Sequence, residues 1–188
     1  MTPDGIFTVA QTALDCVCAA MDDLAETVEG YAGCPCLVYV SAGEPQIECC
    51  TEAFPCSDNG MLTAHLEDVY PSDNFPVPLG GFEPCKAATW VATLVITSAR
   101  CARQMDDEGN IAEAQEMSDS AMLMAIDQYA ILTALGCCLV AEAPARKAKR
   151  RVQIIGTTPQ TSEGGCASVE VRALVELGPV CACSPPTS

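Results

Sequence analysis

The sequence is poor in histidine, and this shortage restricts the catalysis it could perform. His65 is the only histidine among 188 residues, so a Ser-His-Asp or Cys-His catalyst would have to use it. Neither a Gly-x-Ser-x-Gly motif nor a cysteine-protease signature accompanies it. We therefore expect His65 to be a surface residue or a hydrogen-bonded core residue. We do not expect the chain to be an enzyme, and a small enzyme using Cys, Asp or Glu is the weakest alternative.

Cations are scarce as well, and most of them lie in one segment. Nine Lys and Arg stand against 25 Asp and Glu, which gives a formal net charge of −16. A surface this acidic repels nucleic acid and anionic membranes, so DNA near this protein should pass by without specific binding. Five of the nine cations form a short basic segment: Arg146, Lys147, Lys149, Arg150 and Arg151. We interpret it as a segment that docks on an acidic surface, such as a neighbouring copy; a solvated loop and a nucleic-acid contact are the alternatives.

Long apolar runs and targeting signals are also missing from the sequence. The longest apolar run, residues 130–141, contains Thr133 and Gly136 and falls short of the roughly 18 residues that span a bilayer. The first residues show no basic stretch followed by an apolar one, so we expect no signal peptide. These patterns predict a protein that is made in a cytosol and has no membrane partner.

Cysteine is abundant, but its spacing is unusual. The chain has 14 cysteines and no Cys-x-x-Cys, which argues against common zinc and thioredoxin-type sites. The open alternatives are disulfides, small buried apolar residues (our reading of Cys16 and Cys18), and an irregular metal site. The metal site would use four cysteines, Cys34, Cys36, Cys49 and Cys50. Because cytosolic chains seldom hold stable disulfides, a protein made in a cell and released into an oxidising exterior, such as a virion component, would reconcile these facts.

Helical periodicity appears in two segments. In residues 3–28, apolar residues recur at helical spacing, and Gly30 and Gly33 are expected to end the helix. In residues 112–136, Met122, Ile126 and Tyr129 are among the apolar residues near one side, and Gly136 should stop that helix.

Strand patterns occupy most of the remaining chain. We predict strands at residues 36–42, 61–70, 87–103, 152–156 and 166–177. The third, rich in β-branched residues, is long enough to project beyond its sheet. The last two should form a hairpin joined by a polar loop at 157–165.

These elements predict an α+β domain: a mostly antiparallel sheet with two long helices packed on one face. Composition supports a globular chain, since 49% of the residues are hydrophobic and 18% are charged. We expect one domain at residues 1–178 and a Pro/Ser/Cys-rich tail at 179–188.

Two loops stand out as candidate contact segments. Residues 70–81 contain prolines at 71, 76 and 78, which should exclude a central strand and leave an ordered surface loop carrying Phe75. The acidic turn Asp106, Asp107 and Glu108 does not match a calcium-binding loop and is interpreted as a solvated connection.

Three stretches of the chain carry a resemblance to a known family. The first is Gly33-Cys-Pro-Cys-Leu-Val-Tyr-Val with Gly43-x-Pro45 and Cys49-Cys50. The second is Gly60-Met-Leu-Thr with Tyr70-Pro71 and Phe75-Pro76, leading to Cys85 and Arg100-Cys101. The third is Gly164-Gly-Cys-Ala-Ser-Val-Glu-Val. In this order they resemble the tail terminator proteins from the neck of long-tailed actinobacterial phages, over most of residues 1–178.

The resemblance implies a structural virion protein without a cofactor or catalytic residues. Subunits of that family close into a ring, expected to be a hexamer, that ends tail-tube polymerisation at the head–tail junction. The implied partners are other copies of the chain, the tail-tube protein and the connector or stopper proteins, with viral DNA passing through the channel. Synthesis would take place in the bacterial cytoplasm. Loops 70–81 and 157–165, the turn at 106–108 and the basic segment are the expected contacts. A Cys-rich metal-binding or redox module, or another neck or tail-tube protein, is the alternative.

Overall fold

The computed structural model describes residues 3–47, 60–80, 89–101, 113–141, 149–160 and 166–179. Along the chain these residues form helix α1 (Pro3–Ala25), strands β1 (Leu37–Val40), β2 (Met61–Ser72) and β3 (Thr89–Cys101), helix α2 (Ala114–Thr133), a π-helical turn (Ala134–Cys138), the short helix α3 (Leu139–Ala141), and strands β4 (Val152–Gln160) and β5 (Cys166–Pro179). The predicted turn at 106–108, together with Arg146, Lys147, Cys49 and Cys50, lies outside the described residues.

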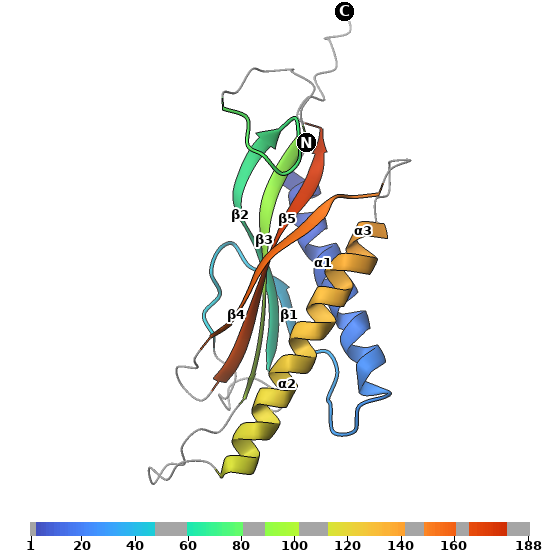
Figure 1. Cartoon of the computed structure of the whole chain (residues 1–188), viewed down its shortest axis with the longest axis vertical. Coiled ribbons are helices and arrows are strands. Elements are labelled where there is room, and N and C mark those ends of the chain that lie inside the picture. Colours follow the sequence, from blue (N-terminus) through green and yellow to red (C-terminus); the bar gives the residue numbers. More distant parts are fainter. Residues whose placement is uncertain are drawn as a thin grey trace, which may run out of the picture.

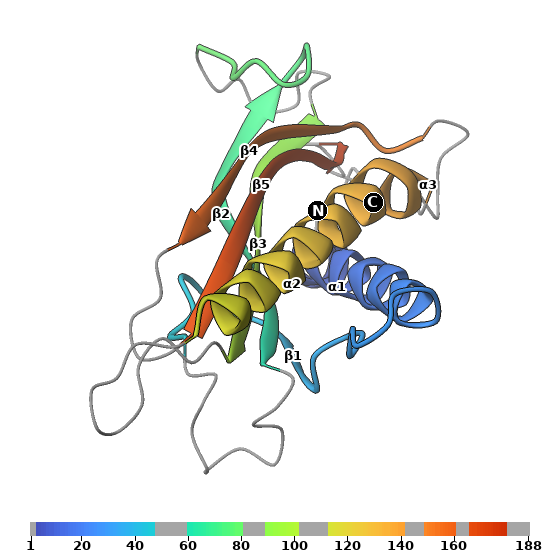
Figure 2. The same cartoon turned by 60° about the horizontal axis from the view of Figure 1, so that its bottom comes forward.

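The strands form one five-stranded sheet in the order β1-β2-β3-β5-β4. Only the pairing of β1 with β2 is parallel; the other three neighbouring pairs are antiparallel. Both long helices lie on the same side of this sheet (Figures 1 and 2). The predicted α+β class with a mostly antiparallel sheet is therefore confirmed.

The core lies between this face of the sheet and the two helices. Helix α1 contributes the apolar residues expected from its periodicity, including Ala13, Leu14, Val17 and Met21, all fully buried. Side chains from β2, β3 and β5 meet them, because alternate residues of a strand point to the same face. The strand members of the core are Leu62, Ala64, Leu94, Ile96, Val169, Val171, Ala173 and Val175.

Helix α2 differs from the prediction in two ways. Met122 and Tyr129, assigned to its apolar side, are 62% and 60% exposed, whereas Asp127, Ala130 and Ile131 are buried. The helical conformation also passes Gly136, because the chain continues through the π-helical turn into α3. The buried Leu135 and Leu139 on either side of Gly136 outweigh the ~1 kcal/mol by which glycine disfavours a helix.

The continuous helical segment Ala114–Ala141 spans 28 residues and is apolar enough, by length and composition, to cross a bilayer. The prediction counted an uninterrupted apolar run, which starts only at Ala130 because Asp127 and Gln128 precede it; the helix includes these residues and is therefore longer. One third of its apolar window, 33%, is buried, and Asp127 in this helix is fully buried and paired with Arg100.

Three strands also differ from prediction. β3 does not project beyond the sheet, because it is paired with β5 over Thr89 to Cys101 and with β2 over most of that length. β4 extends to Gln160, into the predicted loop; an irregularity between Ile154 and Gly156 interrupts its alternation. β2 extends through Pro71, which pairs with Trp90.

Pro71 is compatible with β2 because of the side toward which its backbone points. Its carbonyl accepts a hydrogen bond from the Leu79 N–H at 3.0 Å, on the side away from β3. In a strand the N–H and C=O of one residue point to the same side, so the missing proline N–H is not needed for pairing with β3. β1 pairs only with Met61–Ala64, which leaves β2 as an edge at this position.

Gly60, at the start of β2, allows the closest backbone approach in the described part of the sheet. Its φ is +75°, and a Cβ built there would lie 1.9 Å from the Ala99 carbonyl oxygen. We expect Gly60→Ala to lower the free energy of unfolding by at least about 2 kcal/mol, because strain and backbone overlap add. Gly136→Ala is the matched control: no atom lies within 4 Å of its added Cβ, so it should raise stability by about 0.5–1 kcal/mol. Urea unfolding of both variants tests this pair, and equal effects would contradict it.

Candidate assembly surface

Strand β4 forms an open edge of the sheet. It pairs with β5 on one side and is the last strand in the order, so within the described residues its other side has no neighbouring strand. Residues 153–159 are all exposed, and Ile154 and Ile155 are 40% and 48% exposed. Free backbone N–H and C=O groups beside apolar side chains make such an edge a template for pairing with another chain.

Charged residues and proline, which often protect an edge strand, lie only at the ends of β4, so the irregularity between Ile154 and Gly156 is the one protecting feature in its middle. Lys149 and Arg151 precede the strand and Pro159 lies close to its end, whereas Ile154 and Ile155 occupy its middle. Charge and proline are the common means of preventing edge-to-edge association. Their absence from the middle of β4 leaves an apolar segment available for a partner.

Helix α2 is connected to β4 by a side-chain contact. The Gln128 side-chain amide donates a hydrogen bond to the Thr157 hydroxyl at 3.3 Å, which joins the two elements. Met122 and Tyr129, both largely exposed, are seven residues apart and lie on one side of the helix, roughly a third of a turn away from Gln128 and therefore away from β4. We name the exposed Ile154 and Ile155, with the free edge of β4, the assembly surface.

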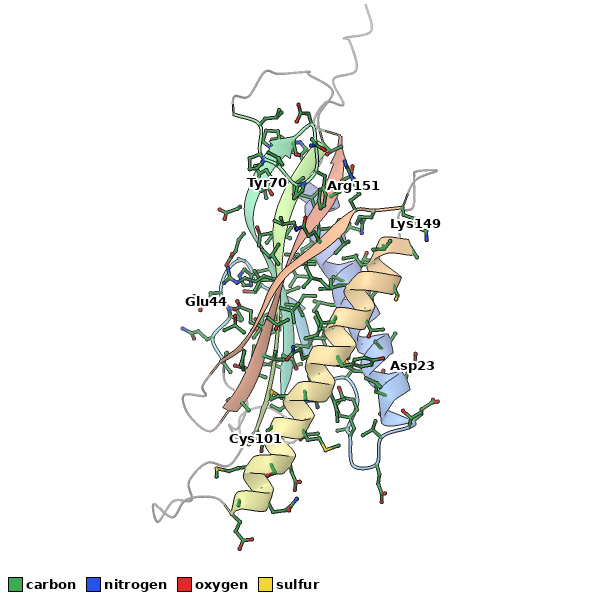
Figure 3. The ribbon with its side chains drawn as sticks, in the orientation of Figure 1. Asp23, Glu44, Tyr70, Cys101, Lys149 and Arg151 are labelled. Carbon is green, nitrogen blue, oxygen red and sulfur yellow. A yellow bond between two sulfur atoms is a disulfide. The ribbon has the colours of Figure 1, made fainter. Side chains whose placement is uncertain are left out.

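The described part of the basic segment, residues 149–151, lies where β4 begins, at the end of the molecule that carries α3 (Figure 3). The Arg150 N–H donates to the Val140 carbonyl at 3.2 Å, which ties the start of β4 to α3. Arg151 forms an ion pair with Glu176 at 3.0 Å, and its guanidinium lies 5.1 Å from the centre of the Phe75 ring. The structure thus brings together two predicted contact residues, Arg151 and Phe75, but uses them within one subunit. Lys149 remains exposed.

On the sheet face opposite the helices, a chain of charged side chains crosses from β2 to β5. Arg172 donates to Glu170 at 2.6 Å and to Glu67 at 2.8 Å. The hydrogen bond to Glu170, followed by the charges of Glu170, Glu67 and Glu44, raises the pKa of Arg172. These charged side chains therefore satisfy one another across the sheet.

His65 lies at the start of this charged chain. It is only 3% exposed, and its Nε2 is 3.5 Å from a Glu67 carboxylate oxygen. Its Nδ1 has no hydrogen-bond partner among the described residues. The expectation of a surface or hydrogen-bonded core residue was therefore only partly met: His65 is buried, but one of its two ring nitrogens finds no partner in the part of the chain that the structure describes.

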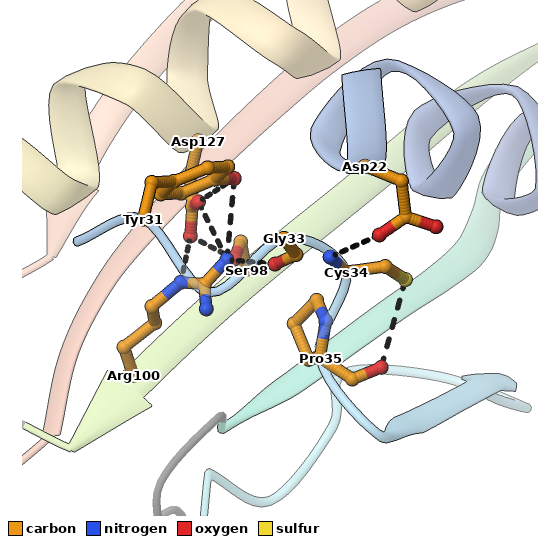
Figure 4. A network of polar contacts seen from close by, with 8 residues as sticks. All are labelled: Asp22, Tyr31, Gly33, Cys34, Pro35, Ser98, Arg100 and Asp127. Atoms are coloured by element: carbon orange, nitrogen blue, oxygen red, sulfur yellow. Dashed lines mark hydrogen bonds and ion pairs between the residues drawn. The ribbon is translucent and has the colours of Figure 1, made fainter. Parts of the chain in front are cut away.

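A buried ion pair joins α2 to the sheet (Figure 4). The Arg100 guanidinium lies 2.7 Å from Asp127, whose side chain is fully buried. Ser98 and Tyr31 donate to the Asp127 carboxylate, each at 2.6 Å. Arg100 also donates to the Gly33 carbonyl at 2.7 Å. One carboxylate thus connects α2, β3 and the segment after α1.

The charges in this network are consistent with its burial. Burial raises the pKa of Tyr31, and the hydrogen bond and charge of Asp127 raise it further. Burial alone would lower the pKa of Arg100, but the hydrogen bond and charge of Asp127 outweigh it, so the net shift is upward. Tyr31 therefore stays neutral and Arg100 stays charged. Sequence reasoning missed this group, although an Asp in the apolar second half of the helix and an Arg near the end of an apolar strand were visible signals.

The cysteines of α1 are joined to other elements. Cys16 is bonded to Cys138 and Cys18 to Cys34, so our reading of Cys16 and Cys18 as small apolar residues was wrong. Because the two residues point to different sides of the helix, one bond reaches the π-helical turn and the other the segment before β1.

The predicted metal ligands are placed as follows. Cys34 and Cys36 are both in disulfides, so in this oxidised form neither is a free thiolate. Cys49 and Cys50 lie outside the described residues. In the described ranges, no group of three or more His, Cys, Asp or Glu side chains could hold a metal ion. Cys101 and Cys166 are disulfide-bonded too, while Cys137 is an exposed free thiol.

Comparison with known protein families finds no match, and comparison with curated proteins finds none either. The most distinctive arrangement among the described residues is an open edge strand with exposed apolar side chains. It lies on a domain that is stabilised by the buried Arg100–Asp127 ion pair and by disulfides.

Proposed function

We propose that this chain is a structural virion protein that assembles with copies of itself into a ring, as a tail terminator at the head–tail junction of a long-tailed phage. The observation that carries the proposal is the open β4 edge with Ile154 and Ile155 exposed in its middle. Exposed apolar groups on an unpaired strand favour association with another chain. Ring closure follows when one surface of a subunit binds a different surface of the next with a closing rotation.

The distribution of charge supports a second copy of the chain as the partner. Each copy carries a net charge of −16, which opposes association unless the contact avoids or neutralises acidic groups. Residues 149–160, the start and length of β4, contain three cations and no acidic residue. This is the segment with which one copy can approach the acidic surface of another most favourably.

The same properties suit a position in the tail neck. An acidic ring would let DNA pass through its channel without sticking, because both carry negative charge. The tail-tube protein below and the connector or stopper proteins above would be its other partners. Disulfides at Cys16, Cys18, Cys34 and Cys138 agree with a protein that is made in the bacterial cytoplasm and works in a released virion.

Substitution of Ile155 tests this proposal. Because burial of one isoleucine contributes about 1.5–3 kcal/mol, Ile155→Lys should raise the concentration of half-assembly at least about tenfold. Light scattering coupled to size-exclusion chromatography measures this, and circular dichroism checks the fold. Phe7→Lys is the matched control, because Phe7 is 56% exposed but lies in α1, outside β4 and outside the predicted contact loops. Unchanged assembly of Ile155→Lys would reject β4 as the assembly edge.

A further inference from the structure

A groove with acidic residues at its edges lies at the other end of the helical layer. It has a volume of about 320 Å³ and runs between the turn after α1 and the first half of α2. Its apolar lining includes Val28, Met122, Leu123 and Ile126, and it carries two carboxylates, Glu29 and Asp119. Both acidic residues are exposed. One oxygen of Asp119 accepts a hydrogen bond from Gln115 at 2.8 Å.

One wall of the groove is held in place by the buried ion pair. Tyr31 lines the groove, and its hydroxyl donates to Asp127 at 2.6 Å. The next residues are fixed by Arg100, which binds the Gly33 carbonyl. A wall tied to the core in this way keeps its shape before a ligand arrives, which lowers the entropic cost of binding.

The chemistry of the groove selects a long cationic side chain. Two carboxylates beside an apolar lining match an ammonium group on an aliphatic stem, because the stem covers apolar surface while the charge meets the carboxylates. Within a homo-oligomer such a side chain must come from one of only nine cations.

Three of these cations already form ion pairs within their own chain. Arg100 is paired with Asp127, Arg172 with Glu67 and Glu170, and Arg151 with Glu176. Lys149, in contrast, is exposed and forms no ion pair with any of the described residues. It also lies three residues before β4, which begins at Val152, so association through β4 would bring it near a neighbour.

Lys149 cannot reach the groove of its own chain. It lies beside α3 (Figure 3), whereas Asp119 is in the first half of α2. The 22 residues from 119 to 141 separate these positions by roughly 30 Å at 1.5 Å per residue. Lys149 and the groove therefore lie on different surfaces, at opposite ends of the helical layer. A head-to-tail contact between copies requires two different surfaces of this kind.

We propose that the groove between the turn after α1 and α2 receives Lys149 of the next copy, with Glu29 and Asp119 as its charge partners. This inference rests on the proposed self-assembly and adds the receiving site and the direction of the contact. Every subunit then gives a cation at one end and accepts one at the other, so each contact relieves part of the repulsion between acidic copies.

A charge exchange tests the contact. Lys149→Glu alone and Glu29→Lys with Asp119→Lys should each raise the concentration of half-assembly about tenfold, since like charges then meet in the groove. The triple variant should return it to near the wild-type value. Asp15→Lys with Asp23→Lys is the matched control: both are exposed residues of α1 that lie outside the groove, and the change in net charge equals that of the groove double variant. Sedimentation velocity measures assembly, and thermal unfolding checks each fold.

The outcomes separate this inference from the proposed function. Rings that form equally well in all variants, or a triple variant that stays impaired, would overturn the docking of Lys149 and leave assembly through β4 intact. A wild-type chain that never associates would overturn both. Only loss in each partner variant with recovery in the triple variant supports the groove.

Discussion

Replacing Asp127 by alanine should lower the free energy of unfolding by about 3–5 kcal/mol, because it leaves the Arg100 charge buried without its partner. Asp127 is fully buried, and its carboxylate is bound by Arg100, Tyr31 and Ser98. Its loss would also leave the Tyr31 and Ser98 hydroxyls without an acceptor. Equilibrium unfolding in urea measures the change.

Two further variants identify the source of this effect. Asp119→Ala is the matched control, because Asp119 is an exposed residue of the same helix and surface changes usually stay within about 0.5 kcal/mol. Replacing both members of the pair, Arg100→Met with Asp127→Leu, should recover much of the loss, since no buried charge remains. An Asp127→Ala protein within about 1 kcal/mol of wild type would refute the role of the pair.

Removing the Cys16–Cys138 disulfide should cost about 4–5 kcal/mol, which is the second large effect. The bond joins residues 122 positions apart, and a cross-link over so long a loop greatly restricts the unfolded chain. We expect this loss for Cys16→Ala with Cys138→Ala in urea unfolding under oxidising conditions.

The neighbouring cysteine supplies the control for this variant. Cys137 is exposed and free, so Cys137→Ala should leave the unfolding midpoint unchanged. If Cys137→Ala were as harmful as the double variant, Cys16 would be paired with Cys137 instead. Adding a reductant should remove the difference between wild type and the double variant, apart from the effect of other disulfides.

The parts of the fold that could be predicted are those with a regular pattern. The helix of α1 followed from apolar residues such as Leu14 and Val17 at helical spacing, and these residues are fully buried. β3 and β5 followed from β-branched content and alternation. In these segments local preference and tertiary packing favour the same structure, so the sequence pattern was sufficient.

The errors occurred where packing outweighed a local signal. Gly136 does not end its helix, because Leu135 and Leu139 are buried on either side of it. The irregularity between Ile154 and Gly156 interrupts the alternation of β4 while its pairing with β5 continues. Local composition contains neither the packing partner nor the register, and both decide the outcome at these positions.

The candidate site was predictable only in part. The basic segment was found from composition, but the use of Arg151 within the subunit depends on Glu176 and Phe75, which are distant in sequence. The exposed side of α2 was misassigned because the apolar Met122 and Tyr129 resemble core residues. Exposure of Ile154 and Ile155 follows from the position of β4 at the end of the sheet, which no local pattern reveals.

In the proposed assembly, stability and association depend on different parts of the chain. The Arg100–Asp127 pair joins α2 to the sheet and the Cys16–Cys138 bond joins α1 to the π-helical turn after α2, whereas β4 is the proposed contact with a partner. Variants in the first set should unfold more easily, and variants in the second should remain folded but fail to associate. This separation makes the functional proposal testable without confusing misfolding with lost assembly.

The most direct test of self-assembly is the mass of the native protein. Native mass spectrometry of the oxidised, purified chain, with negative-stain images of the same sample, measures both the number of subunits and the shape. Our account predicts a closed ring with the mass of a hexamer, which Ile155→Lys converts to folded monomers. A wild-type chain that stays monomeric at high concentration, both alone and with tail tubes, would contradict it.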